Sequence, residues 1–167
     1  MITIVDYKMG NLGSVSNMLK YLGIEARIES DPDKIYESSK LILPGVGAFD
    51  EAMNNINKSG IRQALDDLVI NKKIPVLGIC LGMQLLTNES EEGKQEGLSY
   101  IPAKTKKFRL DKNFKVPHMG WNYLSKISTH KLTDGLNKDN KFYFVHSYHV
   151  EVEDDKYSLL KTKYGEE

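Results

Sequence analysis

Cysteine is nearly absent from this chain: Cys80 is the one thiol among 167 residues, so no disulfide can form within the chain. An excess of charge is missing too, because 23 basic residues balance 23 acidic ones and give no electrostatic reason to expect nucleic acid or an anionic membrane as a partner. The apolar run at residues 1–6 is too short for a signal peptide or a membrane span. These features favour a cytoplasmic protein in a reducing compartment.

The length of the chain suits one ordinary domain that buries a single sizeable core. The sequence contains no internal repeat, no low-complexity tract and no segment with the composition of a linker. We therefore expect residues 1–167 to form one domain.

Strand and helix patterns alternate over the first half of the chain. Asn11 or Ser14 is placed to cap the first helix, which runs to Leu22 with Gly23 as its stop. Strands are expected at residues 2–6, 25–29, 40–43 and 74–79, and further helices at residues 31–36, 48–56 and 61–70. This alternation predicts an α/β fold: a doubly wound, mostly parallel sheet with helices on both faces and with sites at the carboxyl ends of its strands. The apolar residues 74–79 predict a strand that is buried on both faces.

The pattern changes after about Glu92. Segments 98–108, 141–152 and 157–164 favour strands joined by polar turns, with little helical period between them. We expect these segments to form antiparallel or mixed strands appended to the α/β core.

Cys80 lies between an apolar strand and a helical pattern, in the sequence Gly78-Ile79-Cys80-Leu81-Gly82. This order is typical of a nucleophile elbow, in which a sharp turn exposes the reactive atom at the sheet edge and glycines allow the tight backbone. The start of the helix also places the positive end of a helix dipole at the sulfur, which favours the reactive thiolate. The alternative is that Cys80 is an inert packing residue and that the glycines merely make room between helix and sheet.

A second glycine-rich loop, Pro44-Gly45-Val46-Gly47, follows the third predicted strand and should reach the same edge of the sheet. Backbone N–H groups of such a loop can stabilise the oxyanion that forms when a thiolate attacks a carbonyl carbon. Taken alone, the loop is also compatible with a simple turn. It lacks the Lys and Ser/Thr of a phosphate-binding P-loop, so we do not expect nucleotide binding, and we expect neither a cofactor nor a metal ion.

Four motifs together resemble class I glutamine amidotransferases. They are Pro44-Gly45-Val46-Gly47, Gly78-Ile79-Cys80-Leu81-Gly82-Met83-Gln84, Val116-Pro117-His118-Met119-Gly120-Trp121-Asn122 and Tyr143-Phe144-Val145-His146-Ser147-Tyr148. The opening segment, Asp6-Tyr7-Lys8-Met9-Gly10-Asn11, is similar as well, so the resemblance covers nearly the whole chain. Within the family, the chain is most similar to the glutaminase subunits that pair with a HisF-type cyclase barrel in histidine biosynthesis.

The resemblance implies that glutamine is hydrolysed to glutamate and ammonia through a cysteinyl thioester. It also implies a heterodimer, in which the ammonia passes to the barrel partner that makes imidazole glycerol phosphate. By the same resemblance the nucleophile is Cys80, and the oxyanion strand consists of Gly45, Val46 and Gly47. The implied glutamine-binding residues are Gln84, Glu92, Ser147 and Tyr148, and the implied partner-interface residues are Asn11, Trp121 and Asn122.

The chain departs from the family pattern at its end. The family completes its triad with a histidine and a glutamate in a His-Pro-Glu-Lys-Ser segment, and residues 1–167 contain no such segment. One imidazole normally protonates the leaving ammonia and activates the water that hydrolyses the thioester. The chain has four histidines: His118, His130, His146 and His149. The resemblance gives binding or interface roles to His118 and His146. We therefore expect a C-terminally incomplete domain that turns over glutamine inefficiently.

Three alternatives remain open from the sequence. A paralogous amidotransferase subunit could deliver ammonia to a different acceptor, such as a surface-sugar precursor. The missing histidine and glutamate are compatible with a catalytically inactive binding or regulatory subunit. A cysteine hydrolase or redox protein on a similar α/β core would use Cys80 without glutamine.

Overall fold

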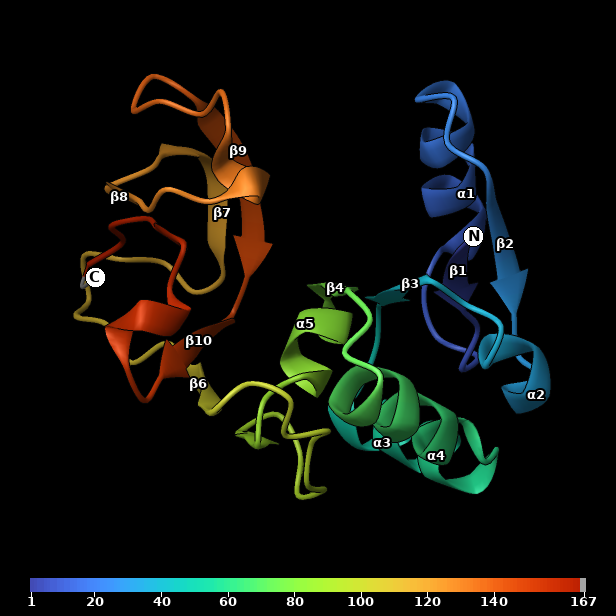
Figure 1. Cartoon of the computed structure of the whole chain (residues 1–167). Helices are drawn as coiled ribbons and strands as arrows, with labels where there is room; N and C mark the ends of the chain where they lie inside the picture. The colour runs from blue at the N-terminus through green and yellow to red at the C-terminus, as the bar shows by residue number, and fades with distance from the viewer. Residues whose placement is uncertain (166–167) are drawn as a thin grey trace. The chain divides into compact units, whose positions relative to one another are not determined.

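The structure of the protein is a computed structural model that describes residues 1–165 (Figure 1). The chain divides into two compact units, the first from Met1 to Lys104 and the second from Thr105 onward. The single domain expected from the length of the chain stays a prediction. Among the described residues, no helix combines the length and the apolar character needed to cross a membrane.

A parallel four-stranded sheet forms the centre of the first unit, in the order β2-β1-β3-β4. Its strands are β1 (Ile2–Val5), β2 (Ala26–Glu29), β3 (Lys40–Gly45) and β4 (Val76–Cys80). The chain runs from β1 outward to β2, crosses back over β1 to β3, and continues to β4. This reversal creates a topological switch point between β1 and β3, the place where open α/β sheets bind their ligands.

Five helices accompany this sheet. They are α1 (Leu12–Tyr21), α2 (Pro32–Ile35), α3 (Phe49–Lys58), α4 (Ile61–Asp66), which continues as a π-helical turn (Asp67–Asn71), and α5 (Leu81–Leu85). Contacts run from α2 to α4, from α4 to α3 and from α3 to α5 (Figure 1), and apolar side chains of these helices build the core on one face of the sheet. Right-handed crossovers put α1 on the other face. Asn11 caps α1, because its Oδ1 accepts the N–H of Ser14 at 3.2 Å.

The spacing of apolar residues explains how α3 packs. Phe49, Ala52, Met53 and Ile56 follow the i, i+3, i+4, i+7 pattern of one helix face, and all four are fully buried. Burial of a large apolar side chain contributes roughly 1.5–3 kcal/mol, so this face holds the helix firmly. α3 is therefore a rigid element that begins directly after the Gly45–Gly47 segment.

The prediction that the fourth strand is buried on both faces is wrong. Val76 of β4 packs against the core, whereas Leu77 and Ile79 on the opposite face are 47% and 39% exposed. β4 comes last in the order of the sheet, and α1, the helix on that face, lies against β1 and β2 instead. Apolar composition therefore indicates burial of one face of this strand and not of both.

The second unit consists of short strands and turns, and two of its strand pairs run antiparallel, as predicted. β7 (His118–Tyr123) pairs with β9 (Lys141–His146), and β8 (Lys126–Ile127) pairs with β11 (Leu160–Lys161). The sequence prediction does not include β7, because Gly120 and Asn122 interrupt its apolar pattern. The remaining elements are β5 (Glu89–Ser90) in the first unit, β6 (Ala103–Lys107), which leads into the second, β10 (Tyr148–Val152) beside it, and 3₁₀ turns at Lys131–Thr133 and Asp155–Tyr157.

Candidate active site

Cys80 ends β4 and directly precedes α5, as predicted for a nucleophile elbow. Its backbone has φ 55° and ψ −115°, a conformation that residues with a side chain rarely adopt, and the residue is exposed. Such backbone strain persists only where the surrounding structure enforces it, and it is concentrated at functional sites. The turn therefore presents the thiol at the carboxyl edge of the sheet.

Two glycines make this turn possible because α5 lies close against the sheet. A Cβ atom on Gly82 would overlap the carbonyl oxygen of Leu43 in β3, and one on Gly78 would lie 2.6 Å from the carbonyl oxygen of Gly82. Both neighbours are backbone atoms, which cannot move aside as a side chain can. The glycines do make room for packing, as the alternative interpretation holds, but packing alone does not require the positive φ of Cys80.

Three loops meet at the carboxyl ends of β1, β3 and β4. Gly45 is the register partner of Cys80, so the Gly45–Gly47 segment begins beside the nucleophile. Gly10, in the loop after β1, approaches the same segment so closely that a Cβ atom on it would lie 3.0 Å from the Cα atom of Gly45. Val46 is 66% exposed. The structure thus brings the predicted nucleophile and the predicted oxyanion segment together at the switch point of the sheet.

Tyr7 is a residue of this site that the sequence prediction misses. The side chain is buried, and its hydroxyl donates a hydrogen bond to the carbonyl oxygen of Pro44 at 2.6 Å. Burial raises the pKa of Tyr7 and negative charge on Cys80 raises it further, so the hydroxyl stays protonated and remains a donor. Two signals in the sequence point to it: the tyrosine lies just past the carboxyl end of β1, where side chains reach the switch point, and it belongs to the opening segment that resembles the family.

Gln84 and Glu92, two of the predicted glutamine-binding residues, share a hydrogen-bond network. The hydroxyl of Ser90 donates to Oε1 of Gln84 at 3.2 Å and accepts the N–H of Glu92 at 3.1 Å. Partial burial of the Glu92 carboxyl group raises its pKa, although the residue as a whole is exposed, and a hydrogen bond with the Gln84 side chain acts in the opposite direction. The network links the Glu92 carboxylate to the amide of Gln84, which lies one helical turn beyond Cys80.

Ser147 and Tyr148, the other predicted glutamine-binding residues, lie in the second unit at the junction of β9 and β10. The backbone N–H of Phe108 donates to the carbonyl oxygen of Ser147 at 3.0 Å. The carbonyl oxygen of Tyr148 accepts a hydrogen bond from Nδ1 of His146 at 2.7 Å. Because Cys80 belongs to the first unit, the roles of these two residues in glutamine binding stay predictions.

Trp121 and Asn122 project from opposite faces of the β7–β9 pair. Trp121 is 68% exposed and packs edge-on against Tyr143, with 5.6 Å between the ring centroids. The Asn122 side chain instead donates to the carbonyl oxygen of Lys163 at 3.1 Å, inside its own unit. By the register of the strands, an exposed surface that we call the aromatic strip consists of Met119, Trp121, Tyr123, Tyr143 and Val145. Asn11 is exposed too, and its side chain caps α1.

All four histidines lie in the second unit, so the unit that holds Cys80 contains none. His118 is buried, its ring stacks on Tyr164 at 3.8 Å, and its Nδ1 lies 3.2 Å from Nε2 of His146. Burial lowers the pKa of His118, and the charge of His146 lowers it further. These two histidines are engaged with each other and with neighbouring aromatic rings.

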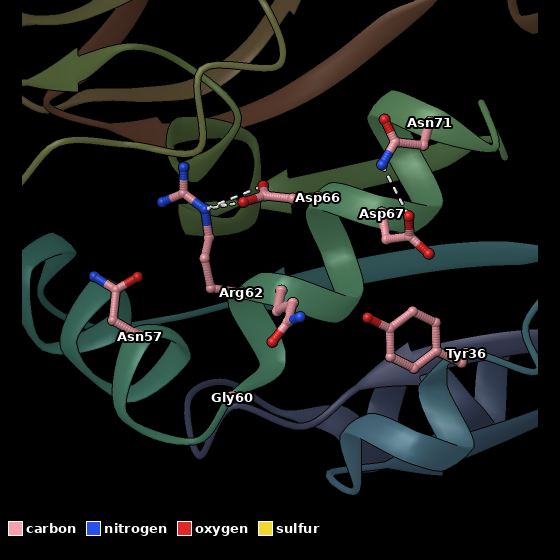
Figure 2. A pocket seen from close by; sticks show the side chains of 8 residues that line it. Tyr36, Asn57, Gly60, Arg62, Asp66, Asp67 and Asn71 are labelled. Atoms are coloured by element: carbon pink, nitrogen blue, oxygen red, sulfur yellow. Dashed lines mark hydrogen bonds and ion pairs between the residues drawn. The ribbon is translucent and has the colours of Figure 1, made fainter.

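A polar cavity of about 510 Å³ lies between α2 and α4 in the first unit (Figure 2). Its charged groups are paired: both carboxylate oxygens of Asp66 accept from Nε of Arg62, at 2.9 and 3.1 Å, and Oδ1 of Asp67 accepts from Asn71 at 2.8 Å. No predicted site residue lines this cavity. Within the described part of the chain, no cluster of His, Cys, Asp or Glu side chains could hold a metal ion.

Comparison with known proteins leads to one family. The family model "Glutamine amidotransferase class-I" matches residues 3–166. The imidazole glycerol phosphate synthase subunit HisH 2 of Methanococcus maripaludis is 52% identical over 100% of this chain and 83% of the relative. The HisH subunits of Sulfurimonas denitrificans and Leptospira interrogans are 48% and 45% identical, over 100% and 99% of this chain and 82% of each relative.

Two solved structures share the fold. A glutamine amidotransferase has a TM-score of 0.66 at 19% identity, over 87% of this chain and 71% of that chain. A glutamine amidotransferase from Thermotoga maritima has a TM-score of 0.59 at 18% identity, over 90% of this chain and 62% of that chain. Both likenesses concern the fold alone, and they confirm the predicted α/β class. Because the family model spans nearly every residue and the relatives are 45–52% identical over the whole chain, the chain belongs to the class I glutamine amidotransferase family.

Proposed function

We propose that the protein is the glutaminase subunit of an imidazole glycerol phosphate synthase, acting in histidine biosynthesis in the cytoplasm. The observation that carries this proposal is the strained Cys80 elbow beside the Gly45–Gly47 segment, with Gln84 on the helix that follows and Glu92 hydrogen-bonded to Gln84. The names of the relatives support the choice of this subunit within the family.

The arrangement suits acyl transfer from the side-chain amide of glutamine. The Cys80 thiolate would attack the amide carbon, and backbone N–H groups of the Gly45–Gly47 segment would stabilise the oxyanion of the tetrahedral intermediate. Collapse of the intermediate breaks the C–N bond, a general acid protonates the departing ammonia, and a γ-glutamyl thioester remains on the sulfur. Water then releases glutamate. The Glu92 carboxylate would pair with the α-ammonium group of the substrate. The Gln84 amide would hydrogen-bond to the same amino-acid end of the glutamine.

Covalent labelling of Cys80 tests the proposal without requiring turnover. A γ-diazoketone analogue of L-glutamine should alkylate Cys80, as seen by mass spectrometry of the labelled peptide, and the Cys80→Ala variant should stay unlabelled. L-glutamine should slow the labelling, whereas L-asparagine, which is one methylene shorter, should not. Labelling that is insensitive to L-glutamine would refute the proposal and favour a cysteine hydrolase or redox protein.

We also propose that the aromatic strip binds the cyclase barrel of a heterodimer. Trp and Tyr anchor many protein interfaces, and a contiguous exposed apolar surface of this kind marks an interaction site. Trp121 lies in the middle of the strip, next to Tyr143. Because Trp121 is 68% exposed, its contribution to the stability of the isolated subunit is small and its contribution to binding can be measured separately.

Calorimetric titration with a HisF-type subunit tests this second proposal. Trp121→Ala should weaken binding by at least about 30-fold, the effect of losing an interface anchor worth roughly 2 kcal/mol. Leu132→Ala, which removes a side chain that is 69% exposed outside the strip, should leave the affinity unchanged. Equal effects of the two substitutions would contradict the docking role. If the wild-type chain fails to bind the HisF-type subunit while glutamine still protects Cys80, the paralogue that feeds a sugar pathway becomes the better assignment.

A further inference from the structure

Asp50 joins two parts of the first unit that are far apart in the sequence. It lies in the first turn of α3, just after the Gly45–Gly47 segment. Its Oδ1 atom accepts the backbone N–H of Lys94 at 2.7 Å and that of Gln95 at 2.9 Å. A carboxylate acceptor makes such bonds stronger than those between neutral groups. Because the apolar face of α3 is buried, these two bonds fix the loop after β5 against a rigid helix.

The loop that Asp50 holds also carries Glu92. The N–H of Gly93 donates to the carbonyl oxygen of Ser90 at 3.1 Å and closes a turn. The hydroxyl of Ser90 ties the beginning of this turn to Gln84 on α5. The turn is therefore fixed at both ends, by Gln84 at its start and by Asp50 at its finish, and Glu92 lies between these two points.

Gly93 is what allows the Asp50 carboxylate to come so near. A Cβ atom on Gly93 would overlap Oδ1 of Asp50, and it would lie 2.7 Å from Cγ of Asp50 and 3.1 Å from Cδ1 of Phe49. Phe49 is buried and cannot move away. The glycine is thus required by space, and the loop and the start of α3 are fitted to each other.

We propose that Asp50 is a positioning residue for glutamine, which sets where Glu92 stands relative to Cys80 and the Gly45–Gly47 segment. The inference rests on the proposed function, since it takes Glu92 to bind the α-ammonium group of the substrate. α3 begins where the oxyanion segment ends, so a carboxylate on its first turn links the two ends of the substrate site. A loop held only through Gln84 would let Glu92 move, which weakens glutamine binding and leaves the thiol itself unchanged.

Protection of Cys80 by glutamine measures this effect. The glutamine concentration that halves the rate of labelling by the diazoketone should rise about tenfold in Asp50→Ala, because two charge-assisted hydrogen bonds are lost. It should rise less in Asp50→Asn, which keeps one acceptor oxygen. Gly93→Ala breaks the same contact from the other side, so it should cause a similar rise, and adding it to Asp50→Ala should change little more. The matched control is Asp33→Ala, which removes an exposed carboxylate on α2.

Alkylation by iodoacetamide separates positioning from a general loss of structure, since this reagent does not use the glutamine site. Each variant should react with iodoacetamide at the wild-type rate at a temperature where it is fully folded, although the lost contacts lower its unfolding temperature. The proposal is overturned if Asp50→Ala and Gly93→Ala keep the wild-type half-protection concentration, or if their protection and iodoacetamide rates change in parallel. Absence of glutamine protection in the wild-type protein would instead refute the proposed function.

Discussion

The hydroxyl of Tyr7 donates one buried hydrogen bond to the carbonyl oxygen of Pro44, which directly precedes the oxyanion segment. Tyr7→Phe therefore isolates the effect of this hydroxyl. The variant leaves the carbonyl oxygen of Pro44 without that partner, at a cost of roughly 1–3 kcal/mol in the free energy of unfolding. We expect the diazoketone to label Cys80 about 3- to 10-fold more slowly, because the segment beside the sulfur is less well fixed, with the glutamine half-protection concentration unchanged. A less stable variant that is labelled at the wild-type rate would show that Tyr7 serves stability alone.

Glu92 gives the glutamine site a dependence on pH whose sign follows from its raised pKa. Only the ionised carboxylate attracts the α-ammonium group of glutamine. As the pH falls from neutrality, Glu92 takes up a proton earlier than an ordinary glutamate, and the half-protection concentration of glutamine should rise. Glu92→Gln should weaken binding about tenfold at neutral pH and should remove most of this pH dependence. A variant that keeps the full pH dependence would exclude Glu92 as its source.

Elements with a strong local period can be predicted from the sequence, and those that depend on distant partners cannot. β1 and α3 follow from an apolar run and from helical spacing, and the Cys80 elbow follows from the glycines around it. The sequence does not predict β7, because its aromatic residues lie on an exposed face and glycine interrupts the pattern. The apolar run of β4 leads to a prediction of too much burial. Burial depends on the position of β4 at the end of the sheet, which only the order of the strands shows.

β7 and β9 are linked by a directed chain of hydrogen bonds through their histidines. His146 donates from Nδ1, because the carbonyl oxygen of Tyr148 can only accept, so its Nε2 accepts from Nδ1 of His118 at 3.2 Å. Nε2 of His118 is then left to accept from the side-chain amide of Asn122 at 3.4 Å. His118 donates from Nδ1 and accepts at Nε2 in this arrangement, so its imidazole is neutral. A proton added to either accepting ring nitrogen would place two hydrogen-bond donors face to face, and that hydrogen bond would be lost.

The lowered pKa of His118 gives the sign of the resulting effect on stability. His118 binds a proton more tightly in the unfolded chain than in the folded one. Its contribution to the free energy of unfolding is therefore complete above about pH 6.5, the ordinary pKa of histidine. The contribution is lost as the pH falls through the lowered pKa of the folded state. Asp155, whose pKa is held at about 2 by Lys126 and Lys161, keeps its contribution to stability throughout this range and loses it only at much lower pH.

Urea unfolding at a series of pH values measures this loss. His118→Phe keeps a ring to stack on Phe144 and Tyr164 but cannot be protonated, so its free energy of unfolding should fall less steeply below about pH 6.5. His130→Phe replaces a histidine outside this chain of bonds and serves as the control. Equal slopes for the wild type and His118→Phe would contradict the assignment.

At the scale of the whole molecule, acyl transfer also requires a general acid and base, and residues 1–104 contain no histidine to fill that role. The unit that holds Cys80 contains no histidine, and His118 and His146 hydrogen-bond to each other in the second unit. By the family resemblance, the base belongs to a His-Pro-Glu-Lys-Ser segment, which residues 1–167 do not contain. We propose that residues 1–167 alone are labelled at Cys80 by glutamine analogues but turn over glutamine slowly.

A chimera tests that proposal. It extends the 167 residues with those that follow the matched region in the Methanococcus maripaludis relative, since the match covers 83% of that relative. With a HisF-type subunit present, ammonia release should rise at least about 100-fold over the 167-residue chain, since a positioned general acid and base contributes that much or more. The rate at which iodoacetamide alkylates Cys80 should change far less, because iodide leaves without taking up a proton. Cys80→Ala in the chimera should abolish ammonia release. If the 167-residue chain already matches the chimera and His146→Ala abolishes its activity, then His146 is the base and the proposal fails.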